Sequence, residues 1–330
     1  MMAIIVPFLF MEVCFAKQVI VYTSVDREFS EPVLKQFEEG TGIKVRAVYD
    51  TEETKGTGLV NRLIAEKDKP RADVFWCGDP IRPALLETKG ITEPYVSGAA
   101  ADIPEKYKCK EGNWTGFSAR VRVILYNTNL VNLDERPLSL FDLAKPKWKD
   151  QVAIANPLFG STAAHMAVLF DTLGDEDAVK FLFDLKTNRV RIVSSNSEVR
   201  RLVVDGEVMV GITDTDEAEM AIQERNPVKK VFPDQGDKDI GTFIMPNVVC
   251  LIKGGPHPDS GKKLIDYLLS KEVERQLAFA SCYQIPLRHD VRRPADVYMI
   301  DAIKGMDVDY HKAAKKMEEI EEFLKDWAGG

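Results

Sequence analysis

Blocks of hydrophobic positions recur along this chain, and their spacing predicts strands that alternate with helices. Residues 18–22 form a short apolar run rich in β-branched side chains, which is typical of a buried strand. Apolar residues then recur at helical spacing, at Phe29, Val33 and Phe37, with charged residues between them. A second strand is expected from residue 43. The first block therefore predicts a strand–helix–strand unit of an α/β fold.

The same alternation continues toward the C-terminus. Two long strands, near residues 118–126 and 241–250, are expected to join two lobes. The strands predicted after the first unit cover residues 72–76, 114–127, 152–155, 191–193, 208–212 and 241–251. One of the predicted helices begins at Gly160. The others cover residues 50–68, 82–89, 218–223, 260–269, 272–280 and 304–327.

The length of 330 residues is greater than that of an ordinary domain and predicts two lobes, each with its own core. Residues 17–117 and 241–290 are expected to form the first lobe, and residues 118–240 and 291–330 the second. The carboxyl ends of the strands would then meet across a cleft, where open α/β sheets bind ligands.

The N-terminal segment, MMAIIVPFLFMEVCFA, is predicted to be a signal peptide of residues 1–16. Its apolar core is too short to cross a bilayer and ends near the small residue Ala16. No basic residue precedes that core, which a start codon assigned too late would explain. A buried strand is the alternative, while Glu12 and Val13 disfavour a lipoprotein anchored through Cys14. A signal peptide predicts a periplasmic protein.

Composition limits the partners. The net charge of −8 and the pI near 5.3 argue against nucleic acid or an anionic membrane as the main partner. The cysteines that remain after the signal peptide show no CxxC pair and no metal-type spacing, which argues against zinc. They could form up to two disulfides or stay as buried thiols, and the sequence leaves the pairing open among Cys77, Cys109, Cys250 and Cys282.

Polar side chains follow five of the predicted strands, at the point where each strand ends. Most of these polar stretches also begin a helix, whose free N–H groups favour an anion. The alternative to ligand binding is that these acidic and hydroxyl side chains only cap the helices. The five stretches are Ser24/Asp26, Gly78/Asp79, Gly160–Thr162, Ser195–Ser197 and Thr213–Asp216.

No catalytic constellation is recognisable among these stretches. The chain holds four histidines, and His165 lies on an otherwise apolar helix, where a core position is expected. No HExxH, GxSxG or GxGxxG motif occurs in a suitable context. A sugar-phosphate hydrolase that uses the aspartates is the enzymatic alternative, but binding without chemistry is the prediction.

At this level of detail the chain resembles the ferric-iron-binding family of periplasmic solute-binding proteins that feed ABC importers. The resemblance rests on VIVYTSVD, ADVFW, FSARVRVILYNTNLV, VDGEVMVGITDTD and PNVVCLIKGGPHPDSGKKLIDYLLS, and it extends from residue 18 to about 290. It implies a type II periplasmic binding-protein fold, with two α/β lobes joined by hinge strands around a ligand cleft. It also implies a monomer that closes on its ligand and docks on an inner-membrane permease.

The iron ligands of that family are not retained here. Its histidine falls at about Asp26, its glutamate at about Gly78, and its two tyrosines at Thr215 and Asp216. Phenolates make such a site selective for ferric iron, and the chain has none at these positions. The residues that hold the family's synergistic anion are retained, and they correspond to Gly160, Ser161, Thr162, Asn196 and Arg120.

Two kinds of ligand fit this pattern. An anion cradle with carboxylates and the aromatic face of Trp76 predicts a small phosphorylated or carboxylated organic solute, bound without an organic cofactor. Alternatively Asp26, Asp79 and Asp216 could hold ferric iron or another metal together with an anion. The expected ligand-binding residues are Ser24, Asp26, Trp76, Gly78, Asp79, Arg120, Gly160, Ser161, Thr162, Asn196, Thr213, Asp214, Thr215 and Asp216.

Overall fold

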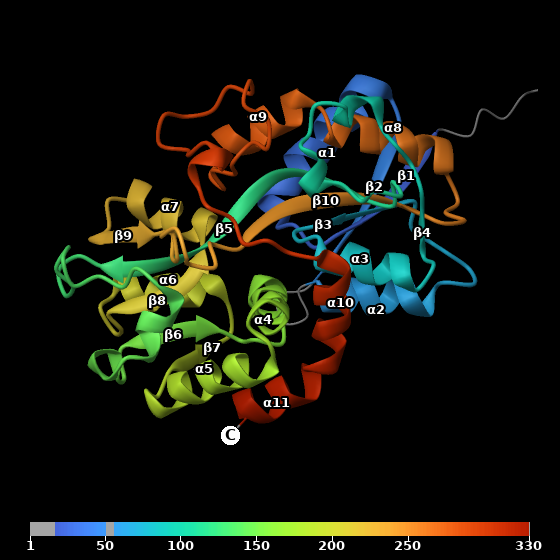
Figure 1. Ribbon diagram of the computed structural model, residues 1–330. Coiled ribbons are helices and arrows are strands. Elements are labelled where there is room, and N and C mark those ends of the chain that lie inside the picture. The colour runs from blue at the N-terminus through green and yellow to red at the C-terminus, as the bar shows by residue number, and fades with distance from the viewer. Residues whose placement is uncertain (1–16, 51–55, 330) are drawn as a thin grey trace, which may run out of the picture.

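A mixed β-sheet runs through both halves of the molecule (Figure 1). The computed structural model describes residues 17–50 and 56–329, so the predicted signal peptide lies outside the described residues. The strands of the described chain are β1 (Gln18–Thr23), β2 (Lys44–Tyr49), β3 (Val74–Cys77), β4 (Thr92–Glu93), β5 (Thr115–Asn127), β6 (Val152–Ala155), β7 (Arg191–Val193), β8 (Val210–Asp214), β9 (Val228–Val231) and β10 (Ile244–Ile252). They follow the order β2-β1-β3-β10-β5-β8-β6-β7, with β4 beside β10 and β9 beside β5.

The first half of the sheet lies between two layers of helices. Strand β1 pairs in parallel with β2 and β3. Alternate residues of β3 face opposite layers, because side chains alternate along a strand. Val74 and Trp76 pack toward α1 (Arg27–Thr41), α8 (Pro258–Leu268) and α9 (Lys271–Phe279). Phe75 and Cys77 pack toward α2 (Thr57–Ala65) and α3 (Ile81–Thr88).

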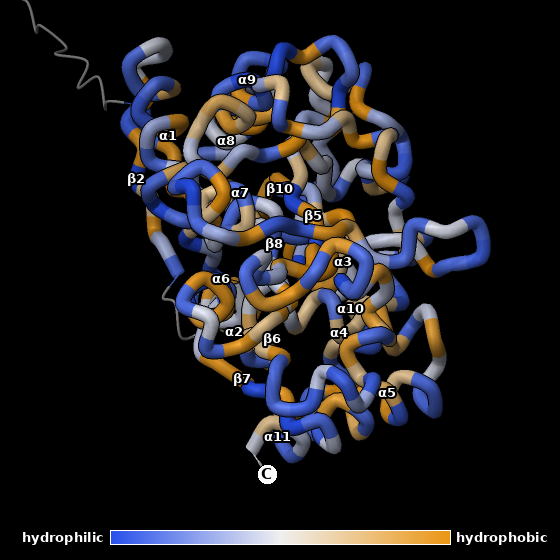
Figure 2. Tube along the Cα trace, turned by 90° about the vertical axis from the view of Figure 1, so that its left-hand side faces the viewer, coloured by the Kyte–Doolittle hydropathy of each residue, from blue (hydrophilic) through white to orange (hydrophobic). Residues whose placement is uncertain are grey.

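The second half repeats this arrangement. Strand β6 pairs in parallel with β7 and β8. Helices α4 (Gly160–Leu173) and α5 (Asp175–Thr187) share one apolar cluster with Val152 and Ile154. Helices α6 (Asn196–Val204) and α7 (Thr215–Gln223) share another with Ala153 and Ala155. The apolar positions of both halves gather in the interior, and polar positions dominate the outer turns (Figure 2).

Strands β5 and β10 connect the halves, as the sequence predicts. The first part of β5 pairs with β10, and its second part pairs with β8 and β9. The crossing is irregular, since the register shifts between Pro246 and Asn247 and Ser118 has a φ of 42°. The amide of Ser118 donates to the buried carboxylate of Glu274 at 2.9 Å. The backbone of this hinge is thus fixed by a side chain of α9.

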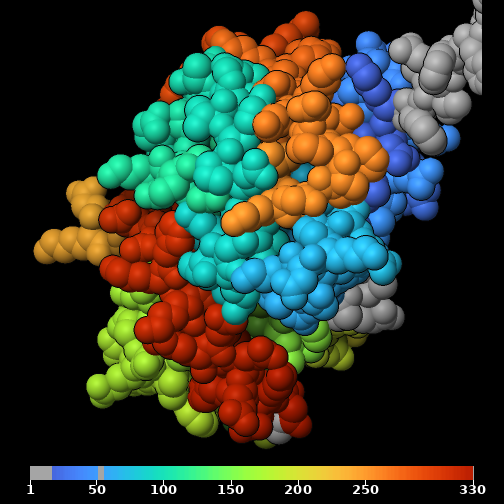
Figure 3. Space-filling model, turned by 90° about the vertical axis from the view of Figure 1, so that its right-hand side faces the viewer, coloured from blue at the N-terminus to red at the C-terminus, as the bar shows by residue number. Residues whose placement is uncertain are grey.

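The C-terminal segment corrects one prediction, because the expected helix of residues 304–327 is two shorter helices. The side chain of Asp309 accepts hydrogen bonds from the amides of residues 311 and 312, so α10 (Tyr310–Glu319) begins there. The helix ends at Ile320, which packs into the core, and α11 (Glu321–Gly329) follows. Helix α10 contacts both α3 and α4, and Figure 3 shows this segment, in red, crossing from one half to the other.

Most other predicted elements are confirmed. The expected helix of residues 50–68 is shorter, since α2 begins after Gly56, whose φ is 81°, and residues 51–55 lie outside the described range. The lobe boundaries stay a prediction. Residues 291–303, assigned above to the second lobe, contribute Val297 and Ile300 to the cluster of α1, α8 and α9.

Two further findings concern the whole described chain. Cys77, Cys109, Cys250 and Cys282 are all buried free thiols, so the disulfide alternative is wrong for these four residues. Among the described residues, no helix combines the length and the apolar character that a membrane span requires.

Candidate functional site

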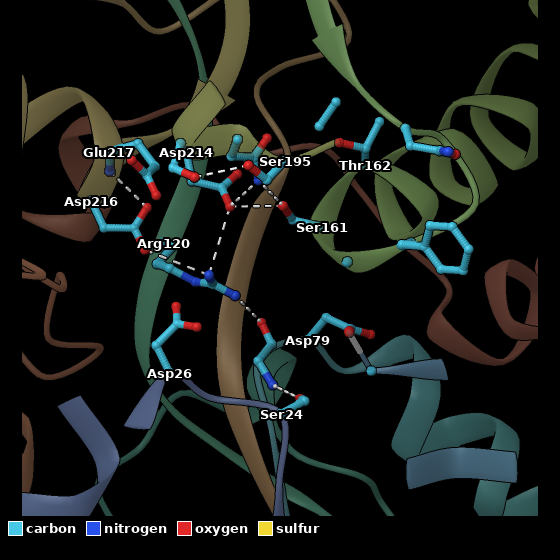
Figure 4. Close-up of a pocket in the computed structure, with 18 of the residues that line it drawn as sticks. Ser24, Asp26, Asp79, Arg120, Ser161, Thr162, Ser195, Asp214, Asp216 and Glu217 are labelled. Atoms are coloured by element: carbon cyan, nitrogen blue, oxygen red, sulfur yellow. Dashed lines mark hydrogen bonds and ion pairs between the residues drawn. The ribbon is translucent and has the colours of Figure 1, made fainter. Parts of the chain in front are cut away.

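A polar cavity lies between the two halves, at the carboxyl ends of the strands. The turns after β1, β3, β6, β7 and β8 all reach it, as expected for parallel strands whose ends meet at one edge. The space open to the centre of a water molecule is about 70 Å³. The sequence-predicted residues that line it are Ser24, Asp26, Gly78, Asp79, Arg120, Gly160, Ser161, Thr162, Asn196, Asp214 and Asp216. Figure 4 shows how the side chains of both halves face one another there.

Arg120 of β5 lies at the centre of this cavity (Figure 4). Its Nη2 donates to the carbonyl of Gly78 at 3.0 Å, and its Nη1 lies 3.6 Å from Asp214 and 3.5 Å from Asp216. Burial alone would lower the pKa of Arg120, but Asp216, Asp214 and Asp26 raise it overall. A Cβ atom at Gly78 would lie only 2.6 Å from Nη2 of Arg120. A side chain at position 78 would therefore displace the guanidinium of Arg120 from this place.

Arg122, two residues further along β5, is a site residue that the sequence analysis missed. It is fully buried, and its Nη1 donates to Ser161 and Asn196 at 3.1 Å each. The same nitrogen donates to Asp214 at 2.6 Å, and Nη2 donates to Thr162 at 3.3 Å. Residues two apart on a strand share a face, so the position of Arg120 could have predicted that of Arg122.

Asp214 is held as an internal anion behind the cavity. Its Oδ2 accepts hydrogen bonds from Ser161 at 2.7 Å and from Asn196 at 3.1 Å, and its Oδ1 accepts from Arg122. Burial would raise the pKa of Asp214, yet Arg122 and Arg120 hold it below its usual value. The side chains predicted to cradle an anion thus already bind a carboxylate of the chain itself.

Backbone amides remain as donors for a ligand anion. Residues Gly160–Thr162 begin α4, and the preceding Phe159 provides no side-chain cap. Asn196 begins α6, where Ser195 caps only the amide of Glu198. The first amides of a helix have no acceptor within the helix, and they carry partial positive charge. Two helix N-termini lining one cavity can hold a phosphate, phosphonate or carboxylate group.

Carboxylates surround the other side of the cavity, near α1 and α7. Asp216 is almost fully buried, and burial raises its pKa to about 6 although Arg120 opposes this shift. Asp26 precedes α1 and faces Arg120 (Figure 4). Glu217 pairs with Arg200 at 3.3 Å. This side of the cavity favours a positively charged group, because a cation stabilises the ionised form of a buried carboxylate.

Arg82 of α3 connects the two halves across the cavity. Its Nη1 donates to Asp79 at 2.5 Å and to the carbonyl of Gly160 at 3.3 Å. Asp79 also accepts from the amides of Ile81 and Arg82 and thereby caps α3. Its carboxylate is therefore occupied by the chain. The signal in the sequence was a lone charge in the apolar first turn of the predicted helix.

Three of the predicted site residues do not line the cavity. Trp76 is fully buried and packs on Phe117 with ring centroids 5.7 Å apart, because the alternation of β3 directs it away from the cavity. Thr213 donates to the carbonyl of Asn196 at 3.3 Å, and Thr215 accepts from the amide of Val121 at 3.1 Å. Neither threonine lines the cavity.

The predicted metal ligands are not brought together either. Within residues 17–50 and 56–329, the carboxylates of Asp26, Asp79 and Asp216 do not form a group close enough to share an ion. Asp79 is already used by Arg82, and the charge of Arg120 lies beside the other two.

Other residues line the cavity without having been predicted as ligand-binding. Phe159 is the aromatic residue among those that line the cavity. The lining residues that the sequence analysis did not assign to the site are Gly56, Arg82, Ala155, Asn156, Phe159, Ser194, Ser195, Ser197 and Glu217.

Comparisons with known proteins agree with this architecture. Residues 72–300 match the family described as bacterial extracellular solute-binding protein. A putative 2-aminoethylphosphonate-binding periplasmic protein of Salmonella paratyphi A is 30% identical over 310 residues, which cover 92% of this chain and 83% of that protein.

Two solved structures show the same fold. Iron-bound HitA from Pseudomonas aeruginosa has a TM-score of 0.83 at 19% identity, covering 93% of this chain and 99% of that chain. AfuA from Actinobacillus pleuropneumoniae, with fructose-6-phosphate bound, has a TM-score of 0.81 at 21% identity, covering 94% of this chain and 98% of that chain. The resemblance to ferric-iron-binding proteins is thereby confirmed. The chain belongs to the bacterial extracellular solute-binding proteins, and with its type II fold it is the periplasmic solute-binding component of an ABC importer.

Proposed function

We propose that this chain, acting as a monomer, binds one small aminoalkyl phosphonate in the cavity and delivers it unchanged to its permease. The observation that carries the proposal is the division of charge across the cavity. Helix N-termini face it from one side, at Gly160–Thr162 and Asn196, and carboxylates face it from the other, at Asp26 and Asp216. A zwitterion with an anionic head and an ammonium tail matches both sides.

The balance of charge supports an ammonium group on the ligand. Five acidic residues line the cavity, against two arginines. Arg82 is committed to Asp79, and Arg122 behind the lining is committed to Asp214. Arg120 is then shared among the remaining carboxylates, including Asp216. A ligand with negative charge alone would add to this excess, whereas an ammonium group offsets it.

The size of the cavity supports a short ligand. A space of about 70 Å³ corresponds to roughly five to seven water-sized positions. A phosphonate with a two-carbon amine has a size of this order, while a hexose phosphate is far larger. The similarity to the Salmonella protein, whose name gives 2-aminoethylphosphonate as its ligand, supports the same ligand class.

Calorimetric titration of the mature protein tests the proposal with matched ligands. We expect 2-aminoethylphosphonate to bind with one site per monomer and to raise the melting temperature. Ethylphosphonate, which lacks only the amine, should bind at least tenfold more weakly. Asp216→Asn should remove most of that difference, whereas the exposed control Glu207→Gln should leave it unchanged. Equal binding of the two phosphonates would overturn the proposed role of the carboxylates.

Ferric iron with a synergistic anion is the second candidate, because related folds include iron-bound HitA. The cavity argues against it, since Arg120 lies between the carboxylates that would have to bind the metal. Ferric citrate therefore belongs in the same titration. A response to ferric citrate alone, with none to any phosphonate, would replace the proposal by iron binding. Recovery of the ligand unchanged after incubation would separate binding from hydrolysis.

A further inference from the structure

A second cluster of ligand-type side chains lies away from the cavity, where α10 crosses α3. It consists of Glu87 on α3, Cys109 and Glu111 on the loop before β5, and His311 on α10. We call these four residues the Cys109 cluster. None of them lines the cavity between the halves. Figure 3 shows the face on which the C-terminal segment, in red, lies against the part of the chain near residue 100, in teal.

The side chains of Glu87, Cys109 and Glu111 lie close enough together to share one metal ion. Cys109 Sγ lies 3.4 Å from both carboxylate oxygens of Glu87 and 3.4 Å from Oε2 of Glu111. One donor atom from each of these three residues lies within 4.8 Å of the others. A tetrahedral zinc ion, with Zn–S of about 2.3 Å and Zn–O of about 2.1 Å, holds its sulfur and oxygen ligands roughly 3.6 Å apart. The observed sulfur–oxygen distances lie within a few tenths of an ångström of that value.

The loop holds Cys109 and Glu111 in place before any ion binds. The amide of Cys109 donates to the carbonyl of Trp114 at 3.0 Å, and the amide of Gly112 donates back to the carbonyl of Cys109 at 3.0 Å. Gly112 has a φ of 80°, which favours glycine. The backbone therefore turns sharply, and Glu111 returns beside the thiol.

Two further residues, Asn113 and His311, contact the carboxylate of Glu87. Asn113 donates to its Oε1 at 3.0 Å and is itself fixed by the hydroxyl of Thr92 at 3.1 Å. His311 Nε2 lies 2.9 Å from Oε2 of Glu87. Hydrogen bonds of this kind orient the carboxylate ligands of metal sites.

The charges of the Cys109 cluster are not balanced by protein cations. In the part of the chain that the structure describes, neither Glu87 nor Glu111 forms an ion pair with a lysine or an arginine. The single proton of Cys109 faces three carboxylate oxygens, so it can satisfy only one of them. A divalent cation that accepts sulfur as well as oxygen ligands would satisfy all of them.

We propose that Glu87, Cys109 and Glu111 form a binding site for a zinc-type divalent cation, with a water in the fourth position and His311 and Asn113 orienting Glu87. Binding forms a metal–sulfur bond and breaks the S–H bond, and the proton leaves to solvent. The site joins α3 to the loop before β5, and α10 is connected to it through the hydrogen bond between His311 and Glu87. The spacing of cysteines could not reveal it, because the site contains a single cysteine.

Proton release gives the site a dependence on pH. A thiol binds a metal ion only after it has lost its proton, so the affinity of the site for the cation should rise as the pH rises. His311, on the far side of Glu87, is the other titratable group that faces the site from α10.

The test is calorimetric titration of the tag-free mature chain with zinc alone, in two buffers of different ionisation enthalpy. We expect one ion per chain and about one proton released. Cys109→Ser and Glu111→Gln should each weaken binding at least tenfold. The matched controls, buried Cys282→Ser and exposed Glu105→Gln in the same loop region, should leave it unchanged.

Cobalt binding provides a spectroscopic signal that a purely structural effect of a substitution would not change. A cobalt–thiolate charge-transfer band in the near ultraviolet should appear with the wild-type chain and be absent in Cys109→Ser. Glu111 is exposed, so Glu111→Gln should fold normally and keep the test valid if Cys109→Ser does not. The absence of zinc binding by the wild type, or binding that both variants retain, would overturn the proposal. Phosphonate titration should be unaffected by either variant, which keeps the two proposals separate.

Discussion

Replacing Asp216 by asparagine should stabilise the ligand-free protein while weakening ligand binding. Asp216 is almost fully buried, and its pKa is raised from 3.8 to about 6, chiefly by burial. A carboxyl group whose pKa is higher in the folded state penalises folding once the pH exceeds the unfolded value. The penalty is nearly absent at pH 4, grows as the pH rises toward 6, and is constant above that.

The size of the effect follows from the two pKa values. A pKa raised from 3.8 to about 6 corresponds to about 3 kcal/mol at pH 8. At pH 4 the same expression gives less than about 1 kcal/mol. Asp216→Asn removes the ionisation but keeps the shape of the side chain. The variant should therefore be more stable than the wild type by up to about 3 kcal/mol at pH 8 and close to it at pH 4.

Urea unfolding of the ligand-free protein at the two pH values measures this difference. The exposed Asp237→Asn serves as the control for loss of one negative charge. Ligand-free protein is needed because the phosphonate and the amine titrate themselves. If Asp216→Asn were no more stable than the wild type at pH 8, or were stabilised equally at both pH values, the raised pKa assigned to Asp216 would be refuted.

Three further changes test other parts of the site. Gly78→Ala should weaken phosphonate binding at least tenfold in a calorimetric titration, because its Cβ would displace Arg120; unchanged affinity would contradict the central place of that guanidinium. Trp76→Ala should lower the free energy of unfolding in urea by about 3 to 5 kcal/mol, as truncation of a buried aromatic residue does. The binding preference between the two phosphonates should not change. Loss of that preference would show that Trp76 contributes to the ligand site. Arg82→Gln should lower the free energy of unfolding by about 3 kcal/mol, because it leaves Asp79 buried without its cation. The ligand should also dissociate faster in a stopped-flow measurement, because the contact of Arg82 with Gly160 is lost. An unchanged dissociation rate would show that Arg82 does not hold the halves together.

Most strands were predictable because they are short apolar runs followed by polar residues, whereas the polar strands β4 and β9 were not predicted. Most predicted strands agree with the structure, including the two that cross between the halves. The polar ends could be recognised for the same reason, since a strand that stops at a polar turn presents that turn at the sheet edge. The C-terminal helices were not predictable in detail, because the cap at Asp309 and the break at Ile320 depend on packing against the rest of the fold.

Within the site, the sequence could not show the directions of individual side chains. Trp76 lies within β3, two residues before Gly78, but its side chain packs into the cluster of α1, α8 and α9 and does not reach the cavity. Arg122 and Arg120 share a face, yet one is buried beneath Asp214 and the other is open to the cavity. Interactions between distant residues, such as that of Arg122 with Ser161, carry no signal in sequence spacing.

Helix α10 constrains how the two halves of this molecule can separate. One apolar cluster runs from α2 and α3 through α10 to α4 and α5, so the halves share a continuous interior as well as hinge strands. A rotation that simply separated them would expose that interior to water at a cost proportional to its area. A motion that keeps the packing of α10 intact avoids this cost. We therefore expect the chain to melt as one cooperative unit rather than lobe by lobe.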